Sequence, residues 1–302
     1  MSFCSICPRQ CNIDRQLNKG FCGESDTVRL ARAALHFYEE PPISGSNGSG
    51  AIFFSGCNLK CVFCQNESIA NNNTGIEVSI EKLADIMLDL QSQNAHNINL
   101  VTPSHYIYQI KKTLILAKEK GLTIPIVYNS SGYELASSIR ELDGLVDIYL
   151  PDFKYMDDEL AVKYSKAPNY SNYAKETIAE MFRQTGSPSF DDNGLMTKGV
   201  IVRHLLLPLA VNNAKNVISY LHDTYEDNIY ISIMNQYTPM TDTPSMKSVA
   251  TLYPELFRKV TKREYNRLLD FVLSLNITNA FFQEGETASD SFIPDFDYTG
   301  IL

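Results

Sequence analysis

The sequence predicts an α/β fold: a partial (β/α)6 barrel preceded by an N-terminal four-cysteine metal-binding extension. From Ala51 onward, strand-like apolar runs alternate with helical patterns, and polar side chains follow the strands at their ends. All seven cysteines lie at or before Cys64, which separates the extension from the rest. Repeated strand–helix units imply a parallel sheet, and right-handed connections curve such a sheet into an open barrel. We therefore expect an extension at residues 1–50 and a core domain at residues 51–302.

The expected strands are short runs of apolar and β-branched residues. They span residues 51–55, 97–102, 124–129, 146–153, 199–207, 229–237 and 280–283. Between the first two strands, helical spacing places a set of apolar residues on one face: Ile80, Leu83, Ile86, Met87 and Leu90. Thr261 and Glu264 form a capping box that opens a helix running to about Asn276. Glu284 and Glu286, after the last strand, are expected to face solvent.

The composition fits one main domain with a sizeable core. The 302 residues include 26 Lys and Arg against 35 Asp and Glu, a net charge of −9. This balance argues against general binding to nucleic acid or to an anionic membrane. The first twenty residues contain charges and cysteines rather than an apolar signal core, and no apolar run reaches membrane-spanning length. We expect a cytoplasmic protein whose substrates are small, neutral or basic.

Three cysteines follow the first expected strand with the spacing Cys-x3-Cys-x2-Cys: Cys57, Cys61 and Cys64. Three thiolates can hold three irons of a 4Fe–4S cluster and leave the fourth iron open for another ligand. The alternatives are a structural zinc site or buried thiols. Zinc would need a fourth ligand nearby, and the next histidine is only His96. The spacing therefore favours a reactive iron–sulfur cluster.

The other four cysteines have the spacing Cys-x2-Cys-x3-Cys-x10-Cys: Cys4, Cys7, Cys11 and Cys22. Four thiolates can close a complete site, and such sites let small loops with few apolar residues fold. Zinc, a single iron or a second iron–sulfur cluster would each satisfy them. Free thiols are the alternative, and a disulfide framework is not expected in a chain of this kind. We expect a second metal site, zinc or iron–sulfur, whose metal the sequence does not decide.

The cysteine loop and the strand ends together resemble the radical SAM superfamily, in particular the pyruvate formate-lyase activating enzymes. The most similar subgroup is described as predicted pyruvate formate-lyase activating, or PflX-like, iron–sulfur proteins. The resemblance covers nearly the whole chain and is carried by Cys4 to Arg9, residues 57–66, 98–103, 147–155 and 235–239. It implies a 4Fe–4S cluster and S-adenosylmethionine (SAM), which is cleaved reductively to a 5′-deoxyadenosyl radical that abstracts a hydrogen atom.

The resemblance also assigns roles to individual residues. The catalytic cluster would be held by Cys57, Cys61 and Cys64. SAM would be bound by Phe63, Asn66, Asn129, Ser131, Asp152, Lys154 and Arg203. Phe63 would shield the adenine, and the ammonium of Lys154 would pair with the methionine carboxylate, although an Asp/Lys pair can also be an ordinary surface ion pair. Residues 102–104, Thr-Pro-Ser, stand where related activases have Gly-Gly-Glu, so the group that holds the SAM amino group is not apparent.

The function implied is that of a radical SAM oxidoreductase of the activase type, with a glycine of a glycyl-radical enzyme as hydrogen donor. One alternative is radical modification of a peptide or small molecule. Another is a non-catalytic iron–sulfur or zinc protein that binds a partner, but a simple relay needs no open iron. The expected electron donor is a flavodoxin or ferredoxin, with no nucleic-acid or membrane partner. His105 and His204, at strand ends, are expected to be hydrogen-bonded structural groups rather than general bases.

Overall fold

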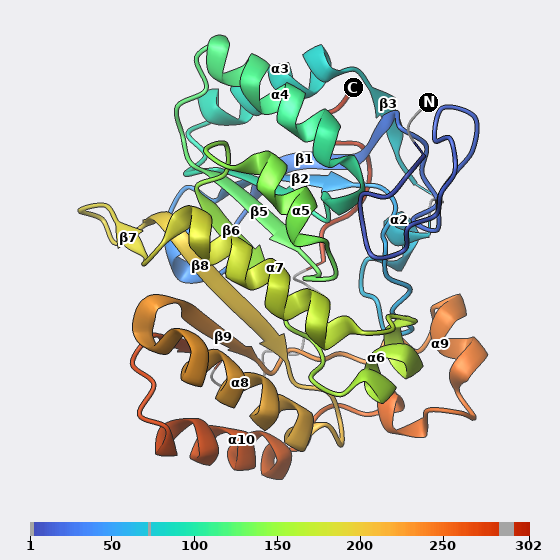
Figure 1. Ribbon diagram of the computed structural model, residues 1–302, viewed down its shortest axis with the longest axis vertical. Coiled ribbons are helices and arrows are strands. Elements are labelled where there is room, and N and C mark those ends of the chain that lie inside the picture. Colours follow the sequence, from blue (N-terminus) through green and yellow to red (C-terminus); the bar gives the residue numbers. More distant parts are fainter. Residues whose placement is uncertain (1–2, 72–73, 284–292) are drawn as a thin grey trace.

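Parallel strands form the centre of the fold, as the alternating pattern predicted (Figure 1). The computed structural model describes residues 3–71, 74–283 and 293–302, so Glu284 and Glu286 lie outside the described residues. One ten-stranded sheet has the order β10-β9-β8-β6-β5-β4-β2-β1-β3, and β7 pairs with β8. The strands are β1 (Val28–His36), β2 (Ser49–Phe54), β3 (Ile76–Val78), β4 (Ile98–Val101), β5 (Ile126–Ser130), β6 (Ile148–Pro151), β7 (Ser189–Phe190), β8 (Met196–Leu205), β9 (Tyr230–Met234) and β10 (Ala280–Phe282).

The sheet is parallel from β2 through β4, β5, β6, β8 and β9 to β10. Each expected strand matches one of these, with boundaries shifted by a few residues. In the order of the sheet, β10 and β3 stand at opposite ends, so the parallel strands form an open rather than a closed barrel. The expected α/β fold with a partial barrel is confirmed, and the carboxyl ends of its strands meet at one edge.

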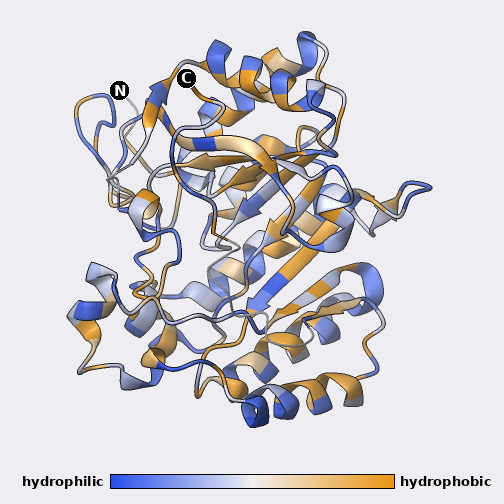
Figure 2. Cartoon of the chain, turned by 180° about the vertical axis from the view of Figure 1, so that it is seen from behind, coloured by the Kyte–Doolittle hydropathy of each residue, from blue (hydrophilic) through white to orange (hydrophobic). Residues whose placement is uncertain are grey.

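Helices cover the outer face of the sheet (Figure 1). They are α1 (Pro41–Ser44), α2 (Glu67–Ala70), α3 (Ile80–Ser92), α4 (Ile107–Glu119), α5 (Ala136–Ile139), α6 (Asp158–Ser165), α7 (Tyr170–Thr185), α8 (Val211–Tyr225), α9 (Pro244–Val249) and α10 (Lys262–Ser274), with 3-10 turns η1 (Ser104–Tyr106), η2 (Arg140–Leu142), η3 (Glu226–Asn228) and η4 (Pro254–Phe257). The long helices carry both hydrophobic and hydrophilic residues, whereas the central strands are mainly hydrophobic (Figure 2). The predicted apolar face of α3 is buried, and the capping box of Thr261 and Glu264 opens α10.

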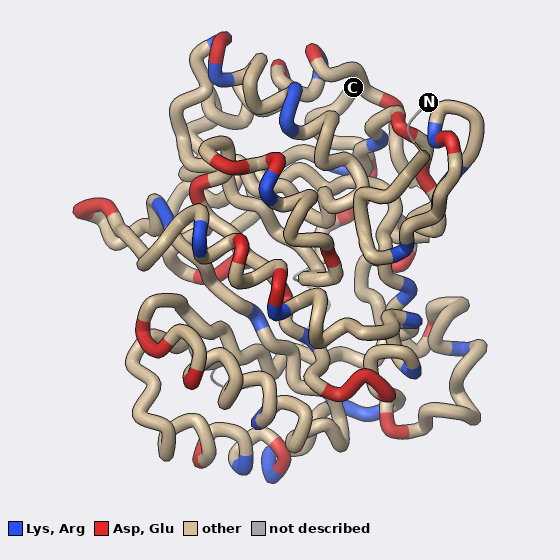
Figure 3. The backbone as a smooth tube through the Cα atoms, in the orientation of Figure 1, with Lys and Arg blue, Asp and Glu red and all other residues tan. Residues whose placement is uncertain are grey.

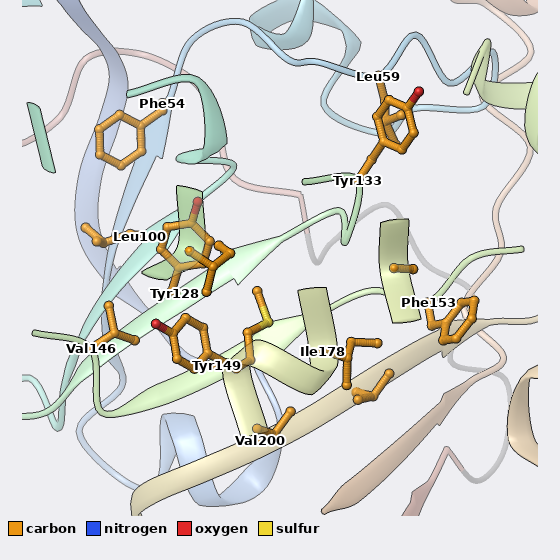
Figure 4. Close-up of a cluster of buried hydrophobic side chains, with 14 of the residues drawn as sticks. Phe54, Leu59, Leu100, Tyr128, Tyr133, Val146, Tyr149, Phe153, Ile178 and Val200 are labelled. Atoms are coloured by element: carbon orange, nitrogen blue, oxygen red, sulfur yellow. The ribbon is translucent and has the colours of Figure 1, made fainter. Parts of the chain in front are cut away.

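Buried aromatic side chains fill the space between the sheet and α7 (Figure 4). The rings of Tyr128 and Tyr149 meet edge to face with centroids 5.9 Å apart. The hydroxyl of Tyr128 donates to Glu134 at 2.7 Å, and that of Tyr149 donates to Gln184 at 2.5 Å. Because each phenol has a partner, these large side chains are buried without leaving a polar atom unsatisfied. This core fixes the positions of β5 and β6, whose ends carry predicted site residues.

Strand β1 is not among the strands expected from the sequence, which begin at residue 51. It pairs antiparallel with β2 and carries the sheet into residues assigned to the extension. The C-terminal segment then lies along β1: Ala33 N–H donates to the Thr299 carbonyl at 2.9 Å, and Arg32 pairs with Asp297 at 2.7 Å. Gly300 has φ of +74°, and a Cβ there would collide with the Ala33 carbonyl. The division into an extension at residues 1–50 and a core domain at residues 51–302 stays a prediction.

Charged residues are spread along the chain, and both signs occur on each of the long helices α3, α4, α7, α8 and α10 (Figure 3). No helix within residues 3–71, 74–283 and 293–302 is both long and apolar enough to cross a membrane.

Candidate functional site

One cavity of about 560 Å³ brings together all ten residues that the sequence assigned to the catalytic cluster and SAM. Its lining includes Cys57, Cys61, Phe63, Cys64, Asn66, Asn129, Ser131, Asp152, Lys154 and Arg203. The cysteines, Phe63 and Asn66 lie on the loop after β2, and the other five lie at or just beyond the ends of β5, β6 and β8. This placement is expected for a parallel α/β sheet, where functional groups gather at the carboxyl ends of strands. The roles of the individual residues stay predictions.

The three cysteines of the loop are free thiols placed around one end of the cavity. Burial raises the pKa of each thiol, that of Cys57 to about 11, and Lys154 acts in the opposite direction on all three. Ser165 donates its hydroxyl to the Cys61 sulfur at 2.9 Å. Three thiolates here would need positive charge beside them, which the irons of a cluster supply. The donor set therefore fits a 4Fe–4S cluster.

The arrangement of the side chains does not suit a single metal ion. No three Cys, His, Asp or Glu side chains in the described part of the chain are arranged as ligands of one ion. A cluster binds each thiolate through a different iron, so its ligands are spread more widely than those of a single ion.

Asp152 joins two cations at the centre of the cavity wall. Its carboxylate accepts from Lys154 Nζ at 2.6 Å and from Arg203 Nε at 3.0 Å. Burial alone would raise the pKa of Asp152, but Lys154 and Arg203 bring it below its usual value. Burial would likewise lower the pKa of Lys154, but Asp152 and Cys61 raise it overall. Both groups are therefore charged at neutral pH, and Lys154 is a cation close to the cysteine loop.

A glycine lets the loop after β5 approach Asp152. Gly132 has φ of +73°, and a Cβ at this position would collide with the Asp152 carbonyl. The hydroxyl of Tyr170 donates to the carbonyl oxygens of Ser131 and Asp152, at 2.7 and 2.9 Å, and so ties the two loops together. This places Ser131 and Asn129 on the same cavity wall as Asp152.

Phe63 and Asn66 occupy the wall beyond the last two cysteines. The Phe63 ring is held edge-on by Tyr164 and Tyr237, with centroids 6.5 and 6.0 Å away. Asn66 precedes α2, but its side chain makes no capping hydrogen bond to that helix. A fixed apolar ring and an amide on one wall suit recognition of a flat heteroaromatic base.

Glu39 and Glu40 are cavity residues that the sequence did not reveal. They lie directly before Pro41, where no strand pattern or cysteine spacing connects them to the barrel. In the structure Glu39 accepts from Asn99 Nδ2 at 3.0 Å, from Asn129 Nδ2 at 3.2 Å and from Arg203 Nη1 at 3.2 Å. The only local signal in the sequence was the pair of consecutive glutamates before Pro41. Their position in the cavity depends on the pairing of β1 with β2.

The two histidines at strand ends lie outside this cavity lining. His105 Nε2 donates to the Ser55 carbonyl at 2.7 Å, and His204 Nδ1 donates to that of Phe153 at 2.7 Å. Burial lowers the pKa of His105 to about 3 and that of His204 to about 4. Each bonded ring nitrogen therefore donates from a neutral imidazole, as expected for a structural histidine.

The N-terminal cysteines lie against the cysteine loop. Cys57 N–H donates to the Cys22 carbonyl at 3.2 Å, and Arg9 Nε donates to the Asn58 carbonyl at 2.8 Å. Burial raises the pKa of Cys7 to about 12, and the other three N-terminal cysteines lie close enough to raise it further. A Cβ on Gly20 would be 3.4 and 3.5 Å from the sulfurs of Cys22 and Cys11. The four thiols thus lie near one another beside the catalytic loop, but no three of them are arranged here as ligands of one ion, and metal binding by them stays a prediction.

The fold and site define a class of enzyme in which three cysteines and a polar cavity stand at the mouth of an open α/β barrel. Residues 51–202 match the radical SAM superfamily, and the chain belongs to this superfamily. Its members use a 4Fe–4S cluster together with SAM. Membership confirms the predicted family and cofactors, while the PflX-like subgroup stays a prediction.

Similar proteins agree with this assignment. "Uncharacterized protein MJ0674" of Methanocaldococcus jannaschii is 29% identical over 91% of this chain and 75% of its own length. A radical SAM methyltransferase from Sphaerobacter thermophilus shares the fold with a TM-score of 0.52, 15% identity and coverage of 78% of this chain and 66% of that one. SuiB of Streptococcus suis, bound to SAM, has a TM-score of 0.50, 16% identity and coverage of 76% and 48%. The chain thus spans about half the length of SuiB.

Replacing Lys154 with Met is expected to weaken SAM binding while leaving cluster content unchanged. The substitution removes an ammonium that lies near the cysteine loop, and a charge-assisted hydrogen bond contributes about 1.5–3 kcal/mol. This corresponds to a roughly tenfold to hundredfold increase in Kd for SAM, measurable by equilibrium dialysis. Lys111→Met is the matched control, because Lys111 pairs with Glu141 outside the cavity lining. Wild-type affinity in Lys154→Met would show that another group holds the carboxylate.

Proposed function

We propose that this protein is a radical SAM oxidoreductase that cleaves SAM reductively and abstracts a hydrogen atom from an organic substrate. The observation that carries the proposal is the convergence of three loop cysteines and the Asp152–Lys154–Arg203 network on one cavity. A structural iron–sulfur site would need neither a cavity nor a charged network beside its thiols.

The residues have distinct tasks in this proposal. Cys57, Cys61 and Cys64 would hold the cluster, which when bound supplies the electron for cleavage of the SAM sulfonium. Lys154, kept charged by Asp152, would orient the methionine carboxylate. Phe63 would cover the adenine and exclude water. Arg203 holds Asp152 in place from β8, so the position of the Lys154 ammonium depends on a neighbouring strand.

The direct test is anaerobic purification followed by iron and sulfide analysis and incubation with SAM and dithionite. The proposal expects four irons per catalytic site and formation of 5′-deoxyadenosine, detected by chromatography. Protein that contains the cluster but yields no 5′-deoxyadenosine or methionine above a cluster-free control would refute it.

We infer further that the enzyme is of the activase type, with a glycine of a glycyl-radical enzyme as hydrogen donor. The support is the Asp152-x-Lys154 pair after β6, which resembles that of the pyruvate formate-lyase activating enzymes and lies in the cavity wall. Incubation with pyruvate formate-lyase, SAM and reductant should give the EPR doublet of a glycyl radical. Cleavage of SAM without such a radical would favour modification of a peptide or small molecule.

The extension at residues 1–50 is proposed to bind a second metal near the route by which electrons enter. Its support is the contact between Cys22 and Cys57 and the gathering of four thiols beside the loop. A flavodoxin or ferredoxin would be the reductant. Because all seven cysteines are free thiols, we place the protein in the cytoplasm, where thiols remain reduced.

Alanine at all three of Cys57, Cys61 and Cys64 is expected to leave metal bound at the extension. The four remaining thiols suffice for a closed site, so the variant should retain about one zinc or iron, or four irons with sulfide, per chain. Elemental analysis of protein prepared anaerobically in metal-replete medium measures this. Colourless protein with zinc would indicate a structural site, and brown protein an accessory cluster. Loss of all metal would contradict the second site.

A further inference from the structure

One carboxylate oxygen of the cavity has no hydrogen-bond partner. Glu40 is 9% exposed and belongs to the cavity lining, together with the buried Ser232 of β9. Its Oε2 is buried and makes no hydrogen bond to any described residue. The backbone around it is fixed, because the Glu40 carbonyl accepts from the N–H groups of Ile43 and Ser44 at 2.8 and 3.1 Å. The backbone that carries the carboxylate is therefore fixed at the cavity wall.

The two cations of the cavity wall form their ion pairs with carboxylates other than that of Glu40. Lys154 is paired with Asp152, and Arg203 is shared between Asp152 and Glu39. No described Lys, Arg or His forms an ion pair with Glu40. Burial raises the pKa of Glu40, and the neighbouring Glu39 raises it further, although Arg203 acts against them. A buried carboxylate without a partner is costly, and a cationic ligand would remove that cost.

Glu40 is not among the residues assigned to SAM, and it borders that set through its charged neighbour Arg203. Lys154 is close enough to lower the pKa of all three loop cysteines, whereas the charged neighbours of Glu40 are Arg203 and Glu39. Glu39, the adjacent residue, accepts from Asn99 within β4 and also from Asn129 and Arg203, so the two glutamates lie beside the residues assigned to SAM. Phe281 and Phe282 of β10 also line the cavity and offer apolar surface for the rest of a ligand.

We propose that Glu40 forms a subsite for a cationic group of the substrate, an ammonium or a guanidinium. The inference rests on the proposed function, since it names the chemistry of the molecule that this cavity takes besides SAM. Glu40 would supply the counter-charge, while Glu39 remains bound to Arg203 and fixes the turn beside it. A cation at this point would hold the substrate by one end and leave its other end directed toward the cysteine loop.

Ligand-observed NMR with small probes tests the subsite. Propylamine and propylguanidine, with neutral 1-butanol for comparison, are titrated into wild-type protein and into Glu40→Gln, each with and without SAM. We expect both cations to bind the wild type at least ~10-fold more tightly than they bind Glu40→Gln, a difference of about 1.4 kcal/mol, whereas 1-butanol should not discriminate. Glu77→Gln is the matched control, because Glu77 is exposed on β3.

The outcomes separate this inference from the proposed function. Equal binding of the cations to both proteins, or none to the wild type, would overturn the subsite even if SAM is cleaved. Weaker SAM binding in Glu40→Gln would also overturn it, since Glu40 would then hold the amino group of SAM. Cation binding that depends on Glu40 in a protein unable to cleave SAM would support the subsite and refute the proposed function.

A peptide-like probe and a thermal-stability measurement complete the test. N-acetylarginine amide, a peptide-like probe, should bind more tightly than propylguanidine if the cation belongs to a peptide, and less tightly if it belongs to a free small molecule. Glu40→Gln removes a buried unpaired charge, so its Tm should equal or exceed that of the wild type. If this variant does not fold, Glu40→Met, which keeps the length of the side chain without an acceptor, takes its place. Unchanged cation binding in Glu40→Met would contradict the subsite.

Discussion

We expect Cys61→Ala to abolish formation of 5′-deoxyadenosine from SAM in the presence of dithionite, down to the background of the assay. The remaining two thiolates of the loop cannot hold the cluster against loss of iron, so the electron source for cleavage is missing. The fold should survive, because Cys61 lies on a loop and is only partly buried. Chromatography of the products and circular dichroism of the variant measure both parts of the expectation.

Cys11→Ala is the matched control, since it also removes one thiol but belongs to the N-terminal group. It should cleave SAM at a rate close to wild type, because dithionite reduces the catalytic cluster without help from the extension. The prediction for Cys61 would be contradicted if the variant kept the change that SAM produces in the EPR spectrum of the reduced cluster. Equal loss in both variants would instead show that the two cysteine groups depend on each other.

The parallel strands were predictable because strands covered on both faces appear as short continuous apolar runs. All six residues of β2 are buried, and so are all four of β4 and all five of β5. Strand β1 has no such run: buried and partly exposed positions alternate along it, and Arg29 and Arg32 interrupt it. Its partner at the C-terminus is more than 260 residues away, as the contact of Arg32 with Asp297 shows. No local pattern reports such a contact.

The cavity was predictable to the extent that it is built from strand ends. Parallel strands place their carboxyl ends at one edge, so residues after β2, β5, β6 and β8 could be grouped without a structure. Asp152 and Lys154 are two residues apart and were predicted as a pair. The bond between Arg203 and Asp152 depends on β6 and β8 being neighbours, and that between Arg203 and Glu39 depends on the course of the chain after β1. Such contacts follow from topology rather than from spacing.

Replacing Arg203 with Leu is expected to destabilise the protein by roughly 3–5 kcal/mol, because it leaves two buried carboxylates without their shared cation. Arg203 binds Asp152 at 3.0 Å and Glu39 at 3.2 Å, and its side chain is 15% exposed. It also donates to Asn129 at 2.6 Å, so the loss extends to the amide that lines the same wall. The free energy of unfolding, from urea denaturation of the metal-free protein under reducing conditions, measures the effect.

Lys120→Met is the control, because the ion pair of Lys120 with Asp85 is on the surface, with side chains 37% and 59% exposed. Exposed pairs of this kind contribute about 0–1 kcal/mol. Arg203→Lys keeps the charge but loses the planar fork that reaches Asp152, Glu39 and Asn129, so it should lie between Leu and wild type. Adding Glu39→Gln to Arg203→Leu should recover part of the loss, since Asp152 keeps its pair with Lys154 while Glu39 is left as the unpaired charge. If Arg203→Leu were no more destabilised than Lys120→Met, the network would not be a structural element of the site.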